Sequence, residues 1–338
     1  MKPFVLRYRS DLTGIRGVAA SMVLLYHAFG FSNGVFSGGY LGVDIFFALS
    51  GFLITSILIR ELTESQRIDL KHFYLRRAQR LLPALILCTA FVAIVVSINL
   101  VPAQTNVSKE QIIPALFYFQ NYSIIAHGYP VSGMLANTWT LSTEEQFYIL
   151  WPALLYIGLI TTNALRMAYI CIIAAGASFL LSVGFALHGN AGNVISYYSP
   201  FTHADGLLLG AATALLAHKG ILPRVRHIHA TIAVVVVGML LLLPIFQPVA
   251  ILLTVISSLV VIAWASTNEA PTWLAWKPFV DIGKISYALY LWQLPVIMIL
   301  QTQFQPGLLL FLSSILILAP VTYVSYRFVE RPILEWRH

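Results

Sequence analysis

Long runs of apolar residues, separated by short polar segments, recur along the whole chain. Each run holds roughly 17 to 22 residues, the length that a helix needs to cross the hydrocarbon core of a bilayer. Because the runs are continuously apolar and do not alternate with polar residues, they predict helices rather than the strands of a membrane barrel. The expected spans are residues 12–31, 41–60, 81–101, 145–162, 166–187, 200–217, 229–246, 248–267, 283–303 and 307–328.

The composition supports an integral membrane protein. The 338 residues are 59% hydrophobic and 10% charged, and the mean hydropathy is +0.81, whereas a soluble domain carries about 25% charged residues. We therefore expect one transmembrane domain over residues 1–338, without a fused extracytoplasmic domain. The basic N-terminus resembles a signal peptide, but no small-residue cleavage site follows it, so an uncleaved first span is expected.

The basic residues predict how the bundle is oriented. With both termini in the cytoplasm, 18 of the 20 Lys and Arg residues fall in cytoplasmic segments, Lys109 lies outside and Arg16 lies within a span. The net charge of +7 is therefore explained by membrane orientation, and membrane lipids rather than nucleic acid are the expected partners. Residues 102–144 form the long external loop. Counting its apolar segment 111–127 as an eleventh span would reverse every later loop, so an interfacial or re-entrant piece is expected there.

Arg16 and His27 are ionisable groups at the two ends of the first span. Eleven residues of helix bring both side chains to one face, about 16 Å apart along the axis. Arg16 could be an anchor that extends to the lipid surface, and His27 could be an interfacial histidine with a satisfied hydrogen bond. Alternatively, Arg16 holds an anionic ligand from the cytoplasm, and His27 is a base that removes a proton at the outer end.

Further polar residues are expected at the external level of the spans. Asp44, Glu144 and the pair His203 and Asp205 open the second, fourth and sixth predicted spans. Ionisable groups at this depth usually line cavities or pair with one another. We therefore expect an outward-facing pocket that contains His27, Asp44 and Glu144. The alternative is that Asp44 and Glu144 only cap their helices.

Six motifs in a fixed order resemble the membrane-bound acyltransferase family 3. They are LTGIRGVAASMVLLYH, GYLGVDIFFALSGFLIT, FYLRRAQRLLP, WTLSTEEQFYILWP, ISYALYLWQLPV and YRFVERP. The resemblance extends from about residue 10 to 332. It implies a multi-pass enzyme of the bacterial cytoplasmic (inner) membrane that performs polysaccharide modification by O-acylation, most often O-acetylation. The donor would be acetyl-CoA or another acyl-CoA, used as a substrate with no permanently bound cofactor. The acceptor would be a carbohydrate hydroxyl outside, such as that of the O-antigen of lipopolysaccharide, exopolysaccharide, peptidoglycan or a lipid-linked sugar.

The resemblance also implies residue roles. Arg16 and His27 match the essential arginine and histidine of the family, and Glu144 matches the glutamate of its WTLS motif. The basic run Arg76, Arg77 and Arg80 would face the CoA phosphates, although ordinary cytoplasmic charge explains the same residues. Glu330 is a candidate partner for Arg16.

The chain departs from the family pattern at two positions. Gln293 stands where relatives usually have histidine, and His203 stands where many have arginine. We expect His203, Asp205, Trp139 and Gln293 to contact the acceptor.

The expected catalytic residues are His27, Arg16, Glu144 and Asp44. His27 would be the general base, oriented by Asp44 or Glu144. Direct transfer and an acyl-histidine intermediate both remain open. The alternative function is a transporter or flippase that moves a glycolipid or acyl donor without chemistry, and a sensor or scaffold is a third reading. Cys88 and Cys171 lie in apolar runs, and no metal site is expected. Envelope-biosynthesis proteins are candidate partners.

Overall fold

The computed structural model describes residues 9–30, 35–127, 133–267 and 273–335, and these residues form helices without any strand. The α-helices are α1 (Ser10–Phe29), α2 (Gly42–Ser65), α3 (Leu70–Ser97), α4 (Pro102–Leu116), α5 (Gln120–His127), α6 (Trp139–Thr161), α7 (Ala164–Ala186), α8 (Gly189–Tyr198), α9 (Asp205–His218), α10 (His227–Leu242), α11 (Gln247–Thr267), α12 (Lys277–Lys284), α13 (Ser286–Leu300), α14 (Leu308–Ser325) and α15 (Arg331–Glu335). Two 3-10 turns, η1 (Ser37–Leu41) and η2 (Ala136–Thr138), precede α2 and α6, and a π-helical turn, η3 (Tyr326–Glu330), follows α14. The all-helical prediction is confirmed.

Each of the ten predicted spans overlaps at least one helix of the described chain. By length and composition, six helices of the described chain could cross a membrane: α1, α2, α3, α7, α11 and α14. A seventh is obtained if α12 and α13, which meet at a bend of 74°, form one broken span. Two further apolar helices, α9 and α10, are shorter. The count of ten spans and the cytoplasmic position of both termini remain predictions.

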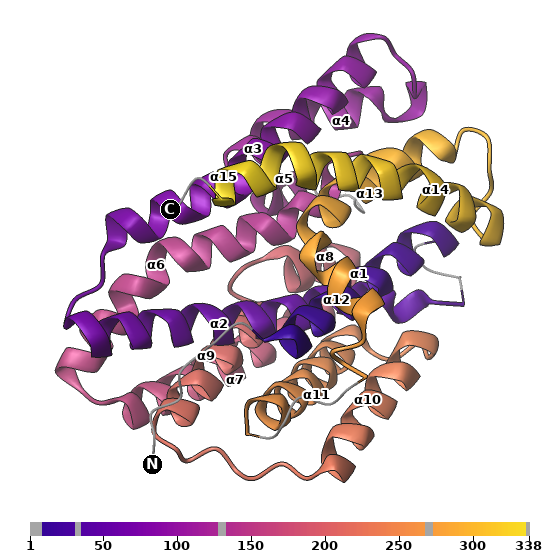
Figure 1. Ribbon diagram of the computed structural model, residues 1–338. Helices are drawn as coiled ribbons and strands as arrows, with labels where there is room; N and C mark the ends of the chain where they lie inside the picture. The colour runs from indigo at the N-terminus through magenta and orange to yellow at the C-terminus, as the bar shows by residue number, and fades with distance from the viewer. Residues whose placement is uncertain (1–8, 31–34, 128–132, 268–272, 336–338) are drawn as a thin grey trace.

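Helices α1 and α2 run through the middle of the bundle (Figure 1), where small residues allow close packing. A Cβ atom at Gly17 would lie 2.1 Å from the carbonyl oxygen of Phe279 in α12, and one at Gly51 would lie 2.0 Å from that of Leu207 in α9. Because no larger residue fits these crossings, glycine is required for α1 and α2 to approach their neighbours. The connections α2–α3 and α6–α7 lie at the same end of the bundle, at the left of Figure 1, as the predicted topology requires.

The predicted external loop 102–144 is mostly helical. The segment 111–127 is broken between α4 and α5, so it does not form one continuous helix. The side chains of Ser108 and Gln111 in α4 accept hydrogen bonds from the backbone of Met134 and Leu135, which fixes the approach to α6. Helix α6 itself begins at Trp139 rather than at residue 145. Because of this earlier start, Glu144 lies within α6 rather than just before it.

Candidate functional site

Two cavities meet inside the bundle, and helix α1 contributes to both. The larger has a volume of about 770 Å³ and is lined by His27, and the smaller has a volume of about 170 Å³ and is lined by Arg16. Val43 and Tyr290 line both cavities. We name the first the aromatic cavity and the second the arginine cavity. The predicted pair Arg16 and His27 therefore faces two adjacent spaces.

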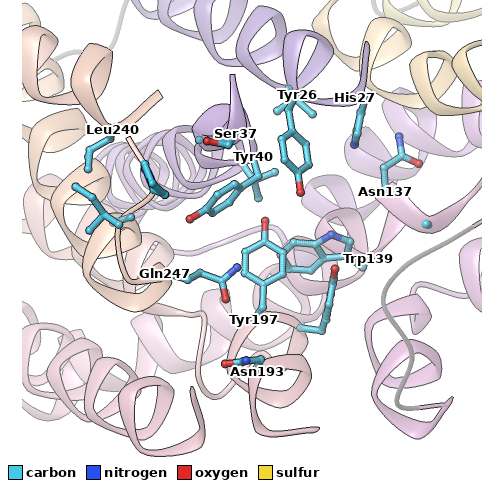
Figure 2. Close-up of a pocket in the computed structure, with 18 of the residues that line it drawn as sticks. Tyr26, His27, Ser37, Tyr40, Asn137, Trp139, Asn193, Tyr197, Leu240 and Gln247 are labelled. Carbon is cyan, nitrogen blue, oxygen red and sulfur yellow. The ribbon is translucent and has the colours of Figure 1, made fainter. Parts of the chain in front are cut away.

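The aromatic cavity is rich in rings and amides. Figure 2 shows Tyr26 and His27 entering from one side of the space and Trp139 and Tyr197 from the other. The Trp139 ring lies 4.9 Å from the Tyr197 ring and 5.0 Å from the Tyr198 ring, measured between centroids. Among the described lining residues there is no Asp, Glu, Lys or Arg. The polar lining groups other than His27 and the aromatic residues are Ser37, Asn137, Asn190, Asn193 and Gln247.

His27 forms part of the wall of the aromatic cavity, with 7% of its surface exposed. Its ring lies 5.6 Å from that of Tyr26. The side chain of Gln293, which is completely buried, interacts with His27. Gln293 also donates a hydrogen bond to the backbone oxygen of Tyr290 at 3.4 Å. Gln293 is not part of the lining of either cavity, so it supports His27 from behind rather than facing the space.

Asp44 is paired with His203 and not with His27. His203 Nε2 lies 2.7 Å from Asp44 Oδ1, and His203 Nδ1 donates to the backbone oxygen of Tyr197 at 2.6 Å. Both side chains are essentially inaccessible to solvent. The pairing of Asp44 with His27 that the sequence suggested is not the one found, because Asp44 bonds to His203, which lies between α8 and α9.

The Asp44–His203 pair supports the aromatic wall from behind. The His203 ring lies 4.9 Å from the Tyr197 ring and 5.5 Å from the Trp139 ring. Asp205, the first residue of α9, is also buried. Of the four expected acceptor contacts, only Trp139 lines the aromatic cavity. His203, Asp205 and Gln293 lie outside its lining.

The arginine cavity combines guanidinium groups with apolar walls. Its polar lining includes Arg16, Arg77, Arg80, Glu144 and Ser286. Its apolar lining is Val43, Phe46, Phe47, Leu53, Ile54, Ile57, Leu81 and Leu141. Arg16 donates from Nε and Nη2 to the Ser286 hydroxyl at 3.2 and 3.0 Å. Such a space suits a ligand that has both an anionic part and an extended apolar part.

Glu144 belongs to the arginine cavity rather than to the neighbourhood of His27. Its carboxylate accepts a hydrogen bond from Ser50 at 2.6 Å, and it interacts electrostatically with Arg77 and Arg16. The predicted pocket of His27, Asp44 and Glu144 is therefore corrected. Since α6 begins at Trp139, Glu144 lies more than one turn into the helix and does not cap it.

The basic run of α3 is divided between two environments. Arg77 bonds to Glu145 at 2.9 Å, and its guanidinium lies 3.4 Å from the centroid of the Tyr148 ring. Arg77 and Arg80 line the arginine cavity, whereas Arg76 is partly exposed, lies 3.9 Å from Glu61 and is not part of this lining.

The side chain of Glu330, the predicted partner of Arg16, lies near the same arginines. Glu330 is buried and interacts electrostatically with Arg80 and Arg16, as its predicted proximity to Arg16 requires.

Several lining residues were not identified from the sequence. Ser286 and Tyr290 lie in a motif that was noted only for Gln293, and Tyr148 lies in the motif that contains Glu144. Tyr40 lies in the quoted motif that contains Asp44 but was given no role, and Tyr197 lies outside the quoted motifs; η1 and α8 bring the two residues to the cavity.

The amino-acid sequence of the chain is similar to those of known acyltransferases. A family model described as an acyltransferase domain matches residues 9–328. The chain is 31% identical, over 97% of its length, to the putative peptidoglycan O-acetyltransferase YrhL of Bacillus subtilis (strain 168), and 30% identical, over 97%, to the O-acetyltransferase OatA of Staphylococcus aureus (strain NCTC 8325 / PS 47). It spans 55% and 57% of the length of these two relatives. No solved structure matches it.

Proposed function

Because the chain belongs to the acyltransferase family whose model matches residues 9–328, we propose that it is a membrane O-acyltransferase that transfers an acetyl group from cytoplasmic acetyl-CoA to a carbohydrate hydroxyl outside the inner membrane. One observation supports this proposal above the others. A cavity rich in arginine and a cavity rich in aromatic and amide groups are adjacent at Val43 and Tyr290, and the α1 residues Arg16 and His27 face one cavity each. Such an arrangement suits two chemically different substrates that meet at one point.

The arginine cavity is the proposed donor site. Three guanidinium groups, from Arg16, Arg77 and Arg80, attract the phosphates of an acyl-CoA, and arginine holds such groups through paired hydrogen bonds. The apolar side chains of the same cavity suit the extended pantetheine arm. Glu144, which accepts a hydrogen bond from Ser50, balances part of the positive charge of Arg77 and Arg16. Acyl-CoA is a substrate in this proposal, and no resident cofactor is required.

The aromatic cavity is the proposed acceptor site. Sugar rings present apolar C–H faces and many hydroxyl groups, so aromatic side chains can stack on their faces while amides bond to their hydroxyls. Trp139, Tyr197 and Asn193 offer both kinds of contact. Since no carboxylate, lysine or arginine is found in the described lining, an acceptor that is uncharged at the reacting sugar is favoured. The names of YrhL and OatA make a glycan of peptidoglycan type the first acceptor to test.

The proposed reaction is a direct acyl transfer. The hydroxyl oxygen of the acceptor attacks the thioester carbonyl carbon, so a C–O bond forms while the C–S bond breaks and its electron pair stays on sulfur. His27 removes the hydroxyl proton as the new bond forms and returns it to the CoA thiolate, which leaves as the free thiol. Gln293 holds the His27 ring in place. An acyl-histidine intermediate would instead release CoA before the acceptor binds.

The proposal can be tested in inverted membrane vesicles from cells that produce the protein, because these vesicles expose the cytoplasmic face and keep the natural acceptor. The vesicles receive acetyl-CoA labelled in the acetyl group, and two products are measured: free CoA thiol and base-labile acetyl esters on carbohydrate. Equal amounts of both, absent from vesicles without the chain, are expected. Labelled donor that crosses the membrane intact, without thiol release, would contradict the proposal and indicate a transporter.

A further inference from the structure

The boundary between the two cavities is formed by few side chains. Val43, the second residue of α2, and Tyr290, the fifth residue of α13, are the residues that line both spaces in the described chain, and 5% and 6% of their surfaces are exposed. One turn after Val43, Phe46 packs edge-on against the Tyr290 ring, with the centroids 6.3 Å apart. The same face of α2 therefore lies opposite Tyr290.

Tyr290 is the immobile side of this boundary. Its hydroxyl accepts a hydrogen bond from Thr140 at 2.8 Å and donates one to the backbone oxygen of Asn137 at 3.0 Å. The Asn137 side chain donates in return to the backbone oxygen of Tyr290 at 2.5 Å. Moving the Tyr290 ring would break the two buried hydrogen bonds of its hydroxyl. Leaving a buried polar group without its partner costs free energy.

Val43 is the adaptable side of the boundary. Its small apolar side chain makes no directional bond, so its size alone determines how much room is left opposite the Tyr290 ring. A thioester held in the arginine cavity has to present its carbonyl carbon to a hydroxyl in the aromatic cavity, and this contact is made where the two cavities meet. The acyl chain beyond the carbonyl then has to fit between Val43 and Tyr290.

From this geometry we infer that Val43 and Tyr290 are the partition at which the thioester is presented, and that the side chain of Val43 determines the longest acyl group that the protein transfers. This inference rests on the proposed function, because it names a specificity-determining residue for the same transfer. The bond changes are those of the proposed reaction: the acceptor oxygen bonds to the acyl carbon, and the sulfur leaves with the electron pair of the C–S bond.

The inference is tested in the inverted vesicles with acetyl-CoA, propionyl-CoA and butyryl-CoA as separate donors. The readout is the ratio of butyryl to acetyl esters formed on carbohydrate. Because one methylene changes discrimination by about tenfold or more, Val43→Ala is expected to raise this ratio about tenfold. Val43→Ile is expected to lower the ratio of propionyl to acetyl transfer. A ratio is unaffected by a variant that folds in lower yield, so both results remain interpretable.

The matched control is Leu49→Ala, which shortens a buried side chain of the same helix that lines neither cavity. Its ratio is expected to stay at the wild-type value. A wild-type ratio in both Val43 variants, or an equal rise in Leu49→Ala, would overturn the role of Val43 while leaving the proposed function intact. If the wild-type protein transfers none of the three acyl groups, the proposed function fails, and the inference fails with it.

Discussion

Arg16 and His27 project from the same helix into two different cavities. Their spacing of 11 residues corresponds to three turns and a rise of about 16 Å, so a ligand group bound at Arg16 cannot touch His27. If the donor phosphates bind near Arg16, an extended arm has to bridge the distance to the acceptor. The separation of the pair is consistent with an enzyme whose two substrates approach from opposite sides of a membrane.

We predict that Arg16→Lys weakens use of the donor. Lysine keeps the charge but cannot place two donors on the Ser286 hydroxyl as Arg16 does. The KM for acetyl-CoA should rise about tenfold, the effect of losing roughly 1.4 kcal/mol of binding, while the kcat changes less. Steady-state assays in vesicles measure both quantities. Arg76→Lys is the control, since Arg76 does not line the arginine cavity, and an equal rise in that variant would contradict the assignment.

The buried Asp44–His203 pair should govern stability more than chemistry. Asp44→Asn removes one charge of a pair that no solvent reaches, and such a change costs about 3–5 kcal/mol. We expect a clearly lower thermal unfolding temperature in detergent. His203→Ala should have a similar effect, and the double variant should lose less than the sum of the two. If Asp44→Asn kept its unfolding temperature but lost activity, Asp44 would instead have a direct catalytic role.

Gln293 should act through His27. Gln293→Ala removes the buried side chain that interacts with His27. We expect a fall in kcat of about tenfold, less than the roughly 10²- to 10⁴-fold that the base itself contributes, and an unchanged KM for acetyl-CoA. Gln293→His, which introduces a side chain that can also hydrogen-bond to His27, should recover most of the rate and shift the pH profile of kcat. An increase in KM for the acceptor alone would indicate that Gln293 contacts the sugar.

The Tyr290 hydroxyl should contribute to the rigidity of the partition. Tyr290→Phe keeps the ring but breaks its hydrogen bonds with Thr140 and Asn137, each worth about 1 kcal/mol. We expect lower thermal stability and a lower rate with acetyl-CoA. Thr140→Val breaks only one of these bonds and should show a smaller effect. Wild-type stability in Tyr290→Phe would mean that the hydroxyl does not hold the ring in place.

The fold was largely predictable from the sequence, because a span of apolar residues in lipid has to satisfy its backbone as a helix. The positions of Arg16 and His27 on one helix also followed from helical spacing. The partners of the other charged residues could not be predicted in this way. Asp44 contacts His203 because α2 packs against α9. Glu144 lines the arginine cavity instead of the predicted outer pocket, because α6 begins before its apolar run.

The aromatic wall was predicted only in part, because Trp139 was expected to contact the acceptor whereas Tyr40 and Tyr197 were not identified. Tyr40 comes from η1 and Tyr197 from α8, and neither residue lies in a predicted span. The centroids of their rings lie 5.8 Å apart, although the two residues are far apart in the sequence. Tyr40, Tyr197 and His27 line one cavity because the folded chain brings distant segments together. The pattern of apolar and polar residues within each segment does not predict this cavity.

The most direct test of the account is transfer of labelled acetyl groups to carbohydrate by His27→Ala in inverted vesicles. The variant has to show the thermal stability of the wild-type protein, and His188→Ala, which changes an exposed histidine outside both cavities, is the matched control. The account predicts that His27→Ala forms no acetyl esters, while His188→Ala forms them at the wild-type rate. Wild-type ester formation by a stable His27→Ala protein would contradict the assignment of His27 as the base.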